Sequence, residues 1–219
     1  MKNDQWNEVD KYIEETIIGS DAALQAALDS SAAEGLPAIA VSPAQGKFLH
    51  LVARLIHARS VLEIGTLGAY STIWLARALP KDGRLISLEV DQHHADVARK
   101  NIARAGLQSI AEVRLGAALE TLPKLRGEGL FDLFFIDADK ANIPEYFRWS
   151  IDLGHSGSVI IVDNVVRGGA LADAYTKDEA VIGVRRLHDM IHKESRVTST
   201  TIQTVGMKGY DGFTMAVIN

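Results

Sequence analysis

The sequence contains no cysteine among its 219 residues. This absence excludes a disulfide framework, a thiolate nucleophile and a zinc ribbon, so any metal ion would have to be held by oxygen or imidazole ligands. The chain also has no internal repeat, no low-complexity tract and no linker rich in Pro, Gly and Ser. A length of 219 residues without such a linker favours a single domain with a substantial core.

Long hydrophobic runs are missing as well. Runs such as Leu133–Ile136 and Val159–Val162 are far shorter than the ~20 residues that cross a bilayer. The first residues, MKNDQWNEVDKY, are polar and lack the apolar core of a signal peptide. We therefore expect a cytoplasmic protein that has no membrane partner.

Basic residues are fewer than acidic ones: the chain has 23 Lys and Arg and 28 Asp and Glu, which gives a net charge of −5. This balance argues against a groove for nucleic acid as the main function. The 47% hydrophobic and 23% charged residues are typical of an ordinary globular protein, so disorder is not expected. Small-molecule substrates remain open.

The pattern of the chain changes near residue 60. Before it, apolar residues recur at helical spacing, and we expect a helical extension over residues 1–41, then a helix capped by Ser42 with Pro43 in its first turn. After it, short apolar runs alternate with helical stretches, which is typical of a parallel sheet covered on both faces. The expected parallel strands are Val61–Ile64, Arg84–Glu89, Ala111–Leu115, Leu130–Ile136 and Ser158–Asp163.

The C-terminal part has a different pattern. After an expected helix at Asp178–Glu194, two segments, Val197–Thr204 and Phe213–Ile218, indicate an antiparallel hairpin whose short turn holds Gly209 and Asp211-Gly212. The fold class is therefore α/β: a doubly wound seven-stranded sheet, mostly parallel with a C-terminal antiparallel hairpin, plus N-terminal helices. We expect one domain over residues 1–219, with its core in residues 42–219.

Four of the five parallel strands end in an acidic residue. Ligands of open parallel sheets bind beyond the carboxyl ends of the strands, so one strand ending in an acid is ordinary, whereas four on one rim indicate a site. The acids are Glu63, Glu89, Asp137 and Asp163, the last followed by Asn164.

The loop after the first strand carries Gly65 and Gly68 and leads to Ser71. Glycines let the backbone pass close to a ligand, and a helix N-terminus near Ser71 favours an anion such as a carboxylate. Glu89 ends the next strand, where its two oxygens can accept hydrogen bonds from ribose hydroxyls. These features fit a dinucleotide or an adenosyl ligand, although the spacing does not match G-x-G-x-x-G.

A second cluster consists of Asp137, Asp163 and Asn164, which follow the fourth and fifth strands. Two carboxylates and an amide oxygen make an all-oxygen site of the kind that Mg²⁺ prefers, with Mn²⁺ or Ca²⁺ as substitutes. The alternative is that Asp163-Asn164 forms only a turn and Asp137 only a cap.

Two further features carry weaker signals. The seven histidines are scattered, and we expect all of them, including His93-His94 at the start of a helix, to be surface or packing residues. Arg167-Gly168-Gly169 opens an aperiodic stretch that reaches Asp178. This stretch is expected to be either a loop over the substrate or a plain surface connector.

Several segments together resemble one family. VLEIGTLGAYSTIWLA, LISLEVD, FFIDADKAN and VIIVDNV, with SPAQGKFL upstream and YDGFTMA downstream, are similar to the cation-dependent, S-adenosylmethionine-dependent O-methyltransferases of the catechol and caffeoyl-CoA type and their bacterial relatives. The resemblance runs from Ser42 to the C-terminus. It implies a Rossmann-like fold, a small catechol-like acceptor and a homodimer.

The resemblance also implies roles for individual residues. Glu89 matches the ribose acid, Ala118 a position beside adenine, Asp137, Asp163 and Asn164 the metal ligands, and Lys140 the catalytic base. The resemblance thus implies that Asp137 contacts the cofactor, binds the metal ion and takes part in catalysis. The positions that match the methionine half of the cofactor are Val41, Glu63, Gly65, Tyr70 and Ser71, and Gly68 belongs to the same loop.

The chain departs from the family pattern at Ile143-Pro144, at His155-Ser156 and at Leu119. These positions touch the substrate wall, a turn and the cofactor edge, so the acceptor is left open. Lys140 could also be a solvated lysine or a partner of Asp139. Two other functions compete with methyl transfer: an NAD-linked oxidoreductase, which leaves Asp163-Asn164 unexplained, and an adenosyl-ligand-binding protein without catalysis.

Overall fold

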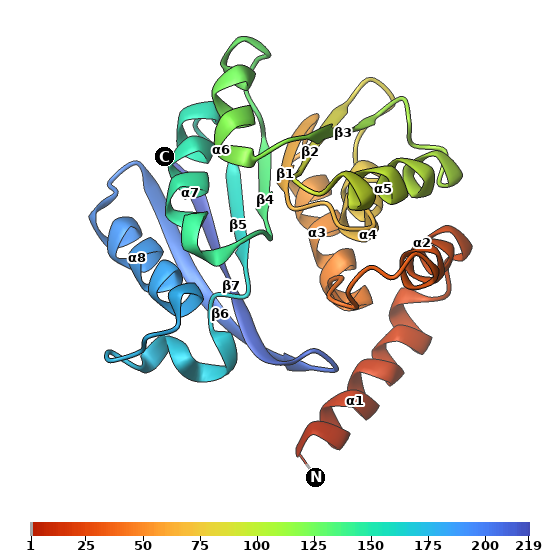
Figure 1. Ribbon diagram of the computed structural model, residues 1–219, viewed down its shortest axis with the longest axis horizontal. Helices are drawn as coiled ribbons and strands as arrows, with labels where there is room; N and C mark the ends of the chain where they lie inside the picture. Colours follow the sequence, from red (N-terminus) through yellow and green to blue (C-terminus); the bar gives the residue numbers. More distant parts are fainter. Residues whose placement is uncertain (1) are drawn as a thin grey trace.

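The computed structural model describes residues 2–219, whose strands form one seven-stranded sheet in the order β3-β2-β1-β4-β5-β7-β6. Strands β1 to β5 are parallel, and β7 runs antiparallel between β5 and β6 (Figure 1). The predicted α/β sheet with its C-terminal hairpin is confirmed. The strands are β1 (Ser60–Ile64), β2 (Arg84–Glu89), β3 (Ala111–Leu115), β4 (Leu133–Ile136), β5 (Val159–Asp163), β6 (Val197–Gly206) and β7 (Gly209–Ile218).

Helices cover both faces of this sheet. On one face lie α3 (Pro43–Leu55), α4 (Tyr70–Ala76) and α5 (Gln92–Arg104), and on the other lie α6 (Ala118–Thr121), α7 (Ile143–Leu153) and α8 (Glu179–Lys193) (Figure 1). Side chains of a strand alternate between the two faces of the sheet. Phe134 therefore packs in the core on the side of α7 and α8, and Phe135 packs in the core on the side of α3, α4 and α5. Short 3₁₀ segments occur at Leu122–Gly127 (η2), Lys140–Asn142 (η3) and Arg167–Ala172 (η4).

The N-terminal extension consists of α1 (Lys2–Ile13), a π-helical turn (Glu14–Ile18, η1) and α2 (Ala22–Ala33). Asp21 caps α2 by accepting hydrogen bonds from the N–H groups of Ala23 and Leu24. Ser42 caps α3 with Pro43 behind it, as the sequence predicts. None of the helices in residues 2–219 is long and apolar enough to cross a membrane.

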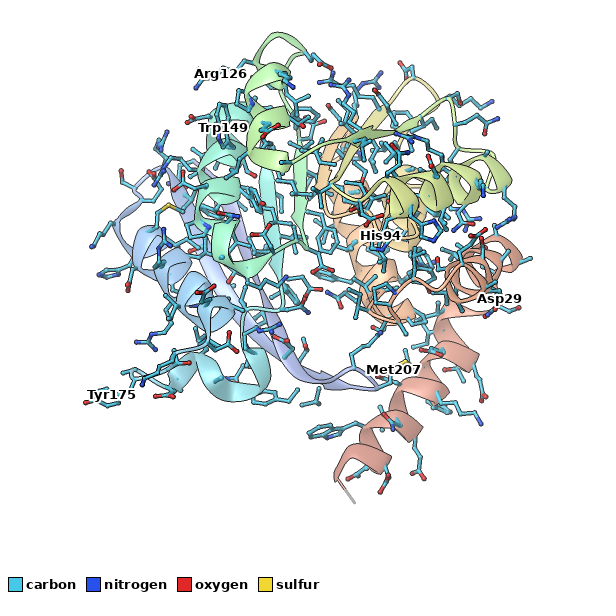
Figure 2. All side chains as sticks on the ribbon, in the orientation of Figure 1. Asp29, His94, Arg126, Trp149, Tyr175 and Met207 are labelled. Atoms are coloured by element: carbon cyan, nitrogen blue, oxygen red, sulfur yellow. The ribbon has the colours of Figure 1, made fainter. Side chains whose placement is uncertain are left out.

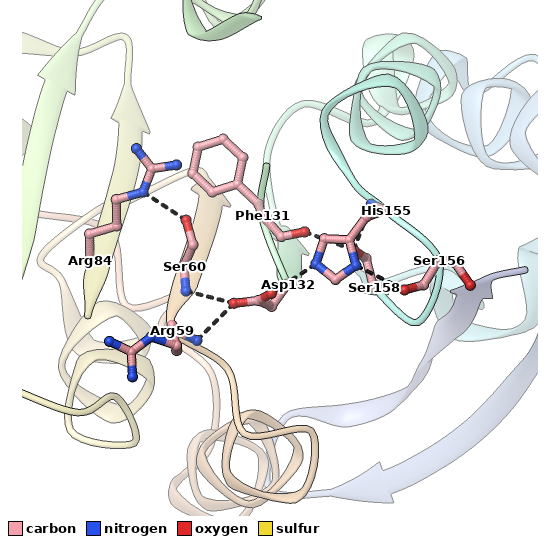
Figure 3. Close-up of polar contacts among 8 residues, drawn as sticks. All are labelled: Arg59, Ser60, Arg84, Phe131, Asp132, His155, Ser156 and Ser158. Atoms are coloured by element: carbon pink, nitrogen blue, oxygen red, sulfur yellow. Dashed lines mark hydrogen bonds and ion pairs between the residues drawn. The ribbon is translucent and has the colours of Figure 1, made fainter. Parts of the chain in front are cut away.

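The amino ends of the central strands are joined by Asp132 (Figure 3). Its carboxylate accepts hydrogen bonds from the N–H groups of Arg59 and Ser60, at 2.8 and 2.9 Å, and from the ring of His155 at 2.8 Å. His155 lies just before β5, so one side chain ties β1, β4 and β5 together. This cluster stands at the end of the sheet away from the strand ends that carry the acids.

The terminal hairpin differs from its prediction. Its strands pair as far as Gly206 opposite Gly209, so the turn is only Met207-Lys208, and Asp211-Gly212 lies inside β7. The sequence signal fails because much of β6 is exposed on both faces and carries no apolar alternation. The longer hairpin brings Met207 close to α1 (Figure 2). There the N–H of Met207 donates a hydrogen bond to Asp10 Oδ2 at 2.7 Å.

Candidate functional site

A cavity of about 720 Å³ opens at the carboxyl ends of β1, β2 and β4. This is the end of an open α/β sheet at which ligands bind. The wall includes most of the residues singled out from the sequence: Val41, Gly65, Tyr70, Ser71, Glu89, Ala118, Asp137, Lys140 and Asn164.

Glu89 fixes the glycine loop at one end of this cavity. Its Oε2 accepts hydrogen bonds from the N–H groups of Thr66 and Leu67 at 3.2 and 2.8 Å, and its Oε1 accepts from Val90 and Asp91 at 2.9 and 3.0 Å. Leu67 adopts a left-handed backbone (φ 49°), which is uncommon for leucine and is a kind of strain that gathers at functional sites. Glu89 therefore shapes the loop as well as facing the cavity.

The two glycines of this loop have different roles. Gly65 has φ +98°, and a Cβ there would lie 2.1 Å from the carbonyl oxygen of Asp137, so only glycine lets β1 pass the end of β4. Gly68 does not line the cavity. A Cβ on Gly68 would meet Ser31 Oγ of α2 at 1.9 Å, and the Gly68 carbonyl accepts a hydrogen bond from Asn101. Its small size thus serves helix packing.

Glu63 lies behind the cavity wall and is fully buried. Ser71, Thr72 and Ser87 donate hydroxyl hydrogen bonds to its carboxylate at 2.5–2.6 Å. Burial raises the pKa of Glu63 to about 7, although these three donors act in the opposite direction. Glu63 therefore holds Ser71 in the wall from the interior.

Asp137 and Asp163 are brought together by strand register. Ile136 of β4 pairs with Val162 of β5, so the two aspartates that follow stand side by side at the rim. Asp163 is only 5% exposed, and burial together with the Asp137 carboxylate raises its pKa. The Asn164 N–H donates to Asp163 Oδ1 at 2.8 Å, and Asn164 has a left-handed backbone (φ 55°).

Lys140 is the cation of this cluster. It is 8% exposed, and its Nζ donates to Asp137 Oδ1 at 3.0 Å. Its predicted alternative partner, Asp139, instead accepts hydrogen bonds from the hydroxyl of Tyr146 and the amide of Asn142. Lys140 is therefore neither solvated nor paired with Asp139, and its ammonium is aimed at the carboxylate pair.

A second cavity, of about 450 Å³, adjoins the first. The two share Ile39–Val41, Asn164 and Arg167 as walls. From Asp163 the second cavity extends between the connector that precedes α3 and the tip of the β6–β7 hairpin. Its wall includes Phe48 of α3 and Phe213 of β7, whose ring centroids lie 5.0 Å apart in a tilted arrangement. Apolar walls of this kind suit an aromatic ring.

Some wall residues were not found from the sequence. His94, predicted to be a surface or packing residue, lines the first cavity with Nδ1 3.9 Å from Glu89 Oε1. Its place follows from the short connection between β2, which ends at Glu89, and α5, which begins at Gln92, so nearness to that acid along the chain could have given the signal. Arg167 lines both cavities; the sequence marks it only as the start of an aperiodic stretch, with a loop over the substrate and a surface connector as the two expectations.

Comparisons with known proteins agree with this geometry. The sequence model of the O-methyltransferase family matches residues 15–217. A catechol O-methyltransferase of Niastella koreensis is 50% identical over 220 residues, covering 100% of both chains. The O-methyltransferase of Bacillus cereus, solved in complex with SAH, has a TM-score of 0.97 at 50% identity and 99% coverage of both chains. TomG of Streptomyces achromogenes, an O-methyltransferase involved in tomaymycin synthesis that was solved with SAM, has a TM-score of 0.97 at 49% identity, covering 100% and 99% of the two chains.

The match spans nearly the whole sequence, from Glu15 within η1 to Val217 within β7. It includes every strand of the sheet and both cavities, apart from the Asp10 contribution of α1. This chain therefore belongs to the O-methyltransferase family.

Proposed function

We propose that this enzyme transfers the methyl group of S-adenosylmethionine to one hydroxyl of a small vicinal dihydroxy aromatic, with a divalent cation at the acceptor. The observation that carries the proposal is the junction of the two cavities. Asn164 and Arg167 line both, while Asp137 and Lys140 line the first and Asp163 the second. A donor in the first cavity and an acceptor in the second would therefore meet at the carboxylate pair.

The first cavity suits the cofactor. Glu89 would accept the ribose hydroxyls. Its carboxylate already accepts four backbone N–H groups, which matches the about four acceptor positions of a carboxylate, so the hydroxyls would replace or share some of these hydrogen bonds. Ala118 would lie beside adenine, and Val41, Gly65, Tyr70 and Ser71 would contact the methionine half. SAH in the Bacillus cereus relative and SAM in TomG support this assignment.

The cluster at the junction fits a hard cation. Two adjacent carboxylates face a single ammonium, which leaves excess negative charge at a buried place. Residues 2–219 hold no group of three or more His, Cys, Asp or Glu that could bind a metal, so the third protein ligand would be the Asn164 amide. Mg²⁺ is commonly held by one or two carboxylates together with water and substrate oxygens. Asp137, Asp163 and Asn164 supply such a set.

The chemistry needs alignment and removal of one proton. A bound divalent cation would supply the acidifying effect that lowers the pKa of a coordinated hydroxyl. Lys140, buried beside Asp137, would act as the base: after giving up one proton of its ammonium, the neutral amine would take the proton of the acceptor hydroxyl. The apolar walls near Phe48 and Phe213 would hold the ring so that oxygen, methyl and sulfur can align.

The competing functions are less favoured. An NAD-linked oxidoreductase is not supported by the family to which the chain belongs. A silent adenosyl-binding protein would have no use for a buried lysine aimed at a carboxylate pair. The proposal includes a homodimer, supported by exposed apolar side chains on the N-terminal helices, such as Tyr12 (67%) and Ile17 (72%).

The test is a methyl-transfer assay with S-adenosylmethionine and a panel of vicinal diols, read by mass spectrometry. Protein stripped with a chelator should be inactive, and Mg²⁺ or Mn²⁺ should restore methylation. Asp163→Ala should abolish the restoration, whereas Asp29→Ala, an exposed position on α2, should leave it unchanged. Full activity after exhaustive chelation would contradict the cation, and methylation of no diol would contradict the acceptor class.

A further inference from the structure

Among the residues that the structure describes, Arg167 is the one charged residue of the cavity walls whose side chain has no hydrogen bond or ion pair. It follows Asn164 by three positions and lines both cavities. Its guanidinium makes no hydrogen bond or ion pair within residues 2–219, and its Nε is buried without a partner. Buried donors in proteins are nearly always paired, so this one calls for a partner that the cavity would receive.

The backbone at Arg167 supports a functional placement. Arg167 has a left-handed conformation (φ 56°), which is uncommon outside glycine and asparagine. Asp211 Oδ1 holds it there by accepting hydrogen bonds from the N–H groups of Val166 and Arg167, both at 3.0 Å. A strained backbone that a half-buried carboxylate maintains is typical of a residue whose side-chain position matters.

The charges of the second cavity leave Arg167 available. Asp10 accepts from the Met207 N–H, Asp211 from three N–H groups, and Asp163 belongs to the carboxylate pair near Lys140. Each carboxylate in the wall is therefore already engaged. The other basic wall residue, Lys208, is exposed at the hairpin and donates to the Ala38 carbonyl at 3.2 Å.

We propose that Arg167 is a specificity-determining residue that selects a methyl acceptor carrying a carboxylate, that is, a vicinal dihydroxy aromatic acid. The inference rests on the proposed function. With the hydroxyls at Asp163 and Asn164 and the ring against the apolar wall, the guanidinium donates to the acid on the ring substituent. Arginine suits this task because its planar fork matches the two oxygens of a carboxylate.

The experiment compares 3,4-dihydroxybenzoate with 3,4-dihydroxybenzamide, which has the same shape without the charge. The variants are Arg167→Gln, Arg167→Lys, and Arg186→Gln, which makes the same change at an exposed position of α8. The wild type should prefer the acid. Arg167→Gln should lower kcat/KM for the acid by roughly tenfold or more, mainly through KM, and change the amide less than about twofold. Arg167→Lys should recover part of the loss, and Arg186→Gln should match the wild type.

Binding measurements separate this inference from the proposed function. Calorimetry should show that the SAH complex of the wild type binds the acid more tightly than the amide, and that Arg167→Gln removes the difference without weakening SAH itself. Turnover of both acceptors with equal kcat/KM would overturn the role of Arg167 and leave the methyl transfer standing. A weakened SAH affinity in Arg167→Gln would instead assign the guanidinium to the cofactor. Turnover of no diol, with no preference in binding, would overturn both.

Discussion

Gly183 of α8 places Lys140, and replacing it with alanine tests the whole arrangement at the junction. A Cβ on Gly183 would lie 2.0 Å from the carbonyl oxygen of Lys140, 2.7 Å from its carbonyl carbon and 3.0 Å from the Cα of Ala141. All three are backbone atoms that cannot rotate away. Real Cβ contacts begin near 3.0 Å, so Gly183→Ala must move α8 or η3 by about 1 Å.

This movement has two measurable consequences. Overpacking costs about 1–3 kcal/mol, partly offset by the gain of about 0.5–1 kcal/mol from replacing a helical glycine. The net loss is at most about 2.5 kcal/mol, which lowers the melting temperature of a chain of this size by up to roughly 10 °C. If η3 yields, Lys140 moves with it and kcat should fall by up to ~10²-fold, whereas a shift of α8 alone would lower only the melting temperature. SAH affinity should stay unchanged in either case, because Glu89 lies at the end of β2 and not on α8 or η3.

The assay needs calorimetry for SAH, kcat for a methylated diol and a thermal melt. Gly127→Ala is the matched control, because a Cβ there meets nothing within 4 Å and the residue lies in the 3₁₀ segment η2. A Gly183→Ala protein with the kcat of the wild type and an equal or higher melting temperature would refute the reasoning. The close approach of α8 would then have no bearing on Lys140.

Three further predictions concern other parts of the chain. Glu89→Gln turns an amide NH₂ toward backbone N–H donors, and should weaken SAH binding by roughly tenfold or more in calorimetry; unchanged affinity would remove Glu89 from the cofactor site. Lys140→Ala should lower kcat by ~10²–10⁴-fold with SAH affinity retained, and a native kcat would show that Lys140 is not the base. Hydrogen bonds to the Ser156 carbonyl and to Asp132 raise the pKa of His155, so its contribution to stability is full below its ordinary pKa of about 6.5 and is lost as the pH rises through the folded value. The pair is partly exposed and worth no more than about 1 kcal/mol, so His155→Gln should lower the melting temperature at pH 6 more than at pH 8.5, and an equal loss at both would contradict the ion pair (Figure 3).

The rim of acids was predictable because parallel strands carry their carboxyl ends to the same edge of a sheet. β2 and β3 were predicted with the bounds that the structure has, and Asp137 and Asp163 meet because the residues before them are paired. The exposed β6 lacks the alternation that marks a strand, so the extent of the hairpin was predicted too short. No pattern along the chain shows whether a strand-end acid faces a cavity, as Glu89 does, or is buried behind its wall, as Glu63 is.

The α/β class, the strand ends that carry chemistry and the resemblance to a methyltransferase family could be inferred from the sequence, because they depend on local periodicity and on residues close together along the chain. Which segments meet is seen only in the folded chain. Gly68 packs on Ser31 of α2, Gly183 presses against Lys140, and the hairpin tip closes the second cavity against the N-terminal region. Such contacts join residues far apart in sequence, where the side chain that fits is set by the shape of the neighbouring element and not by its own surroundings in the chain.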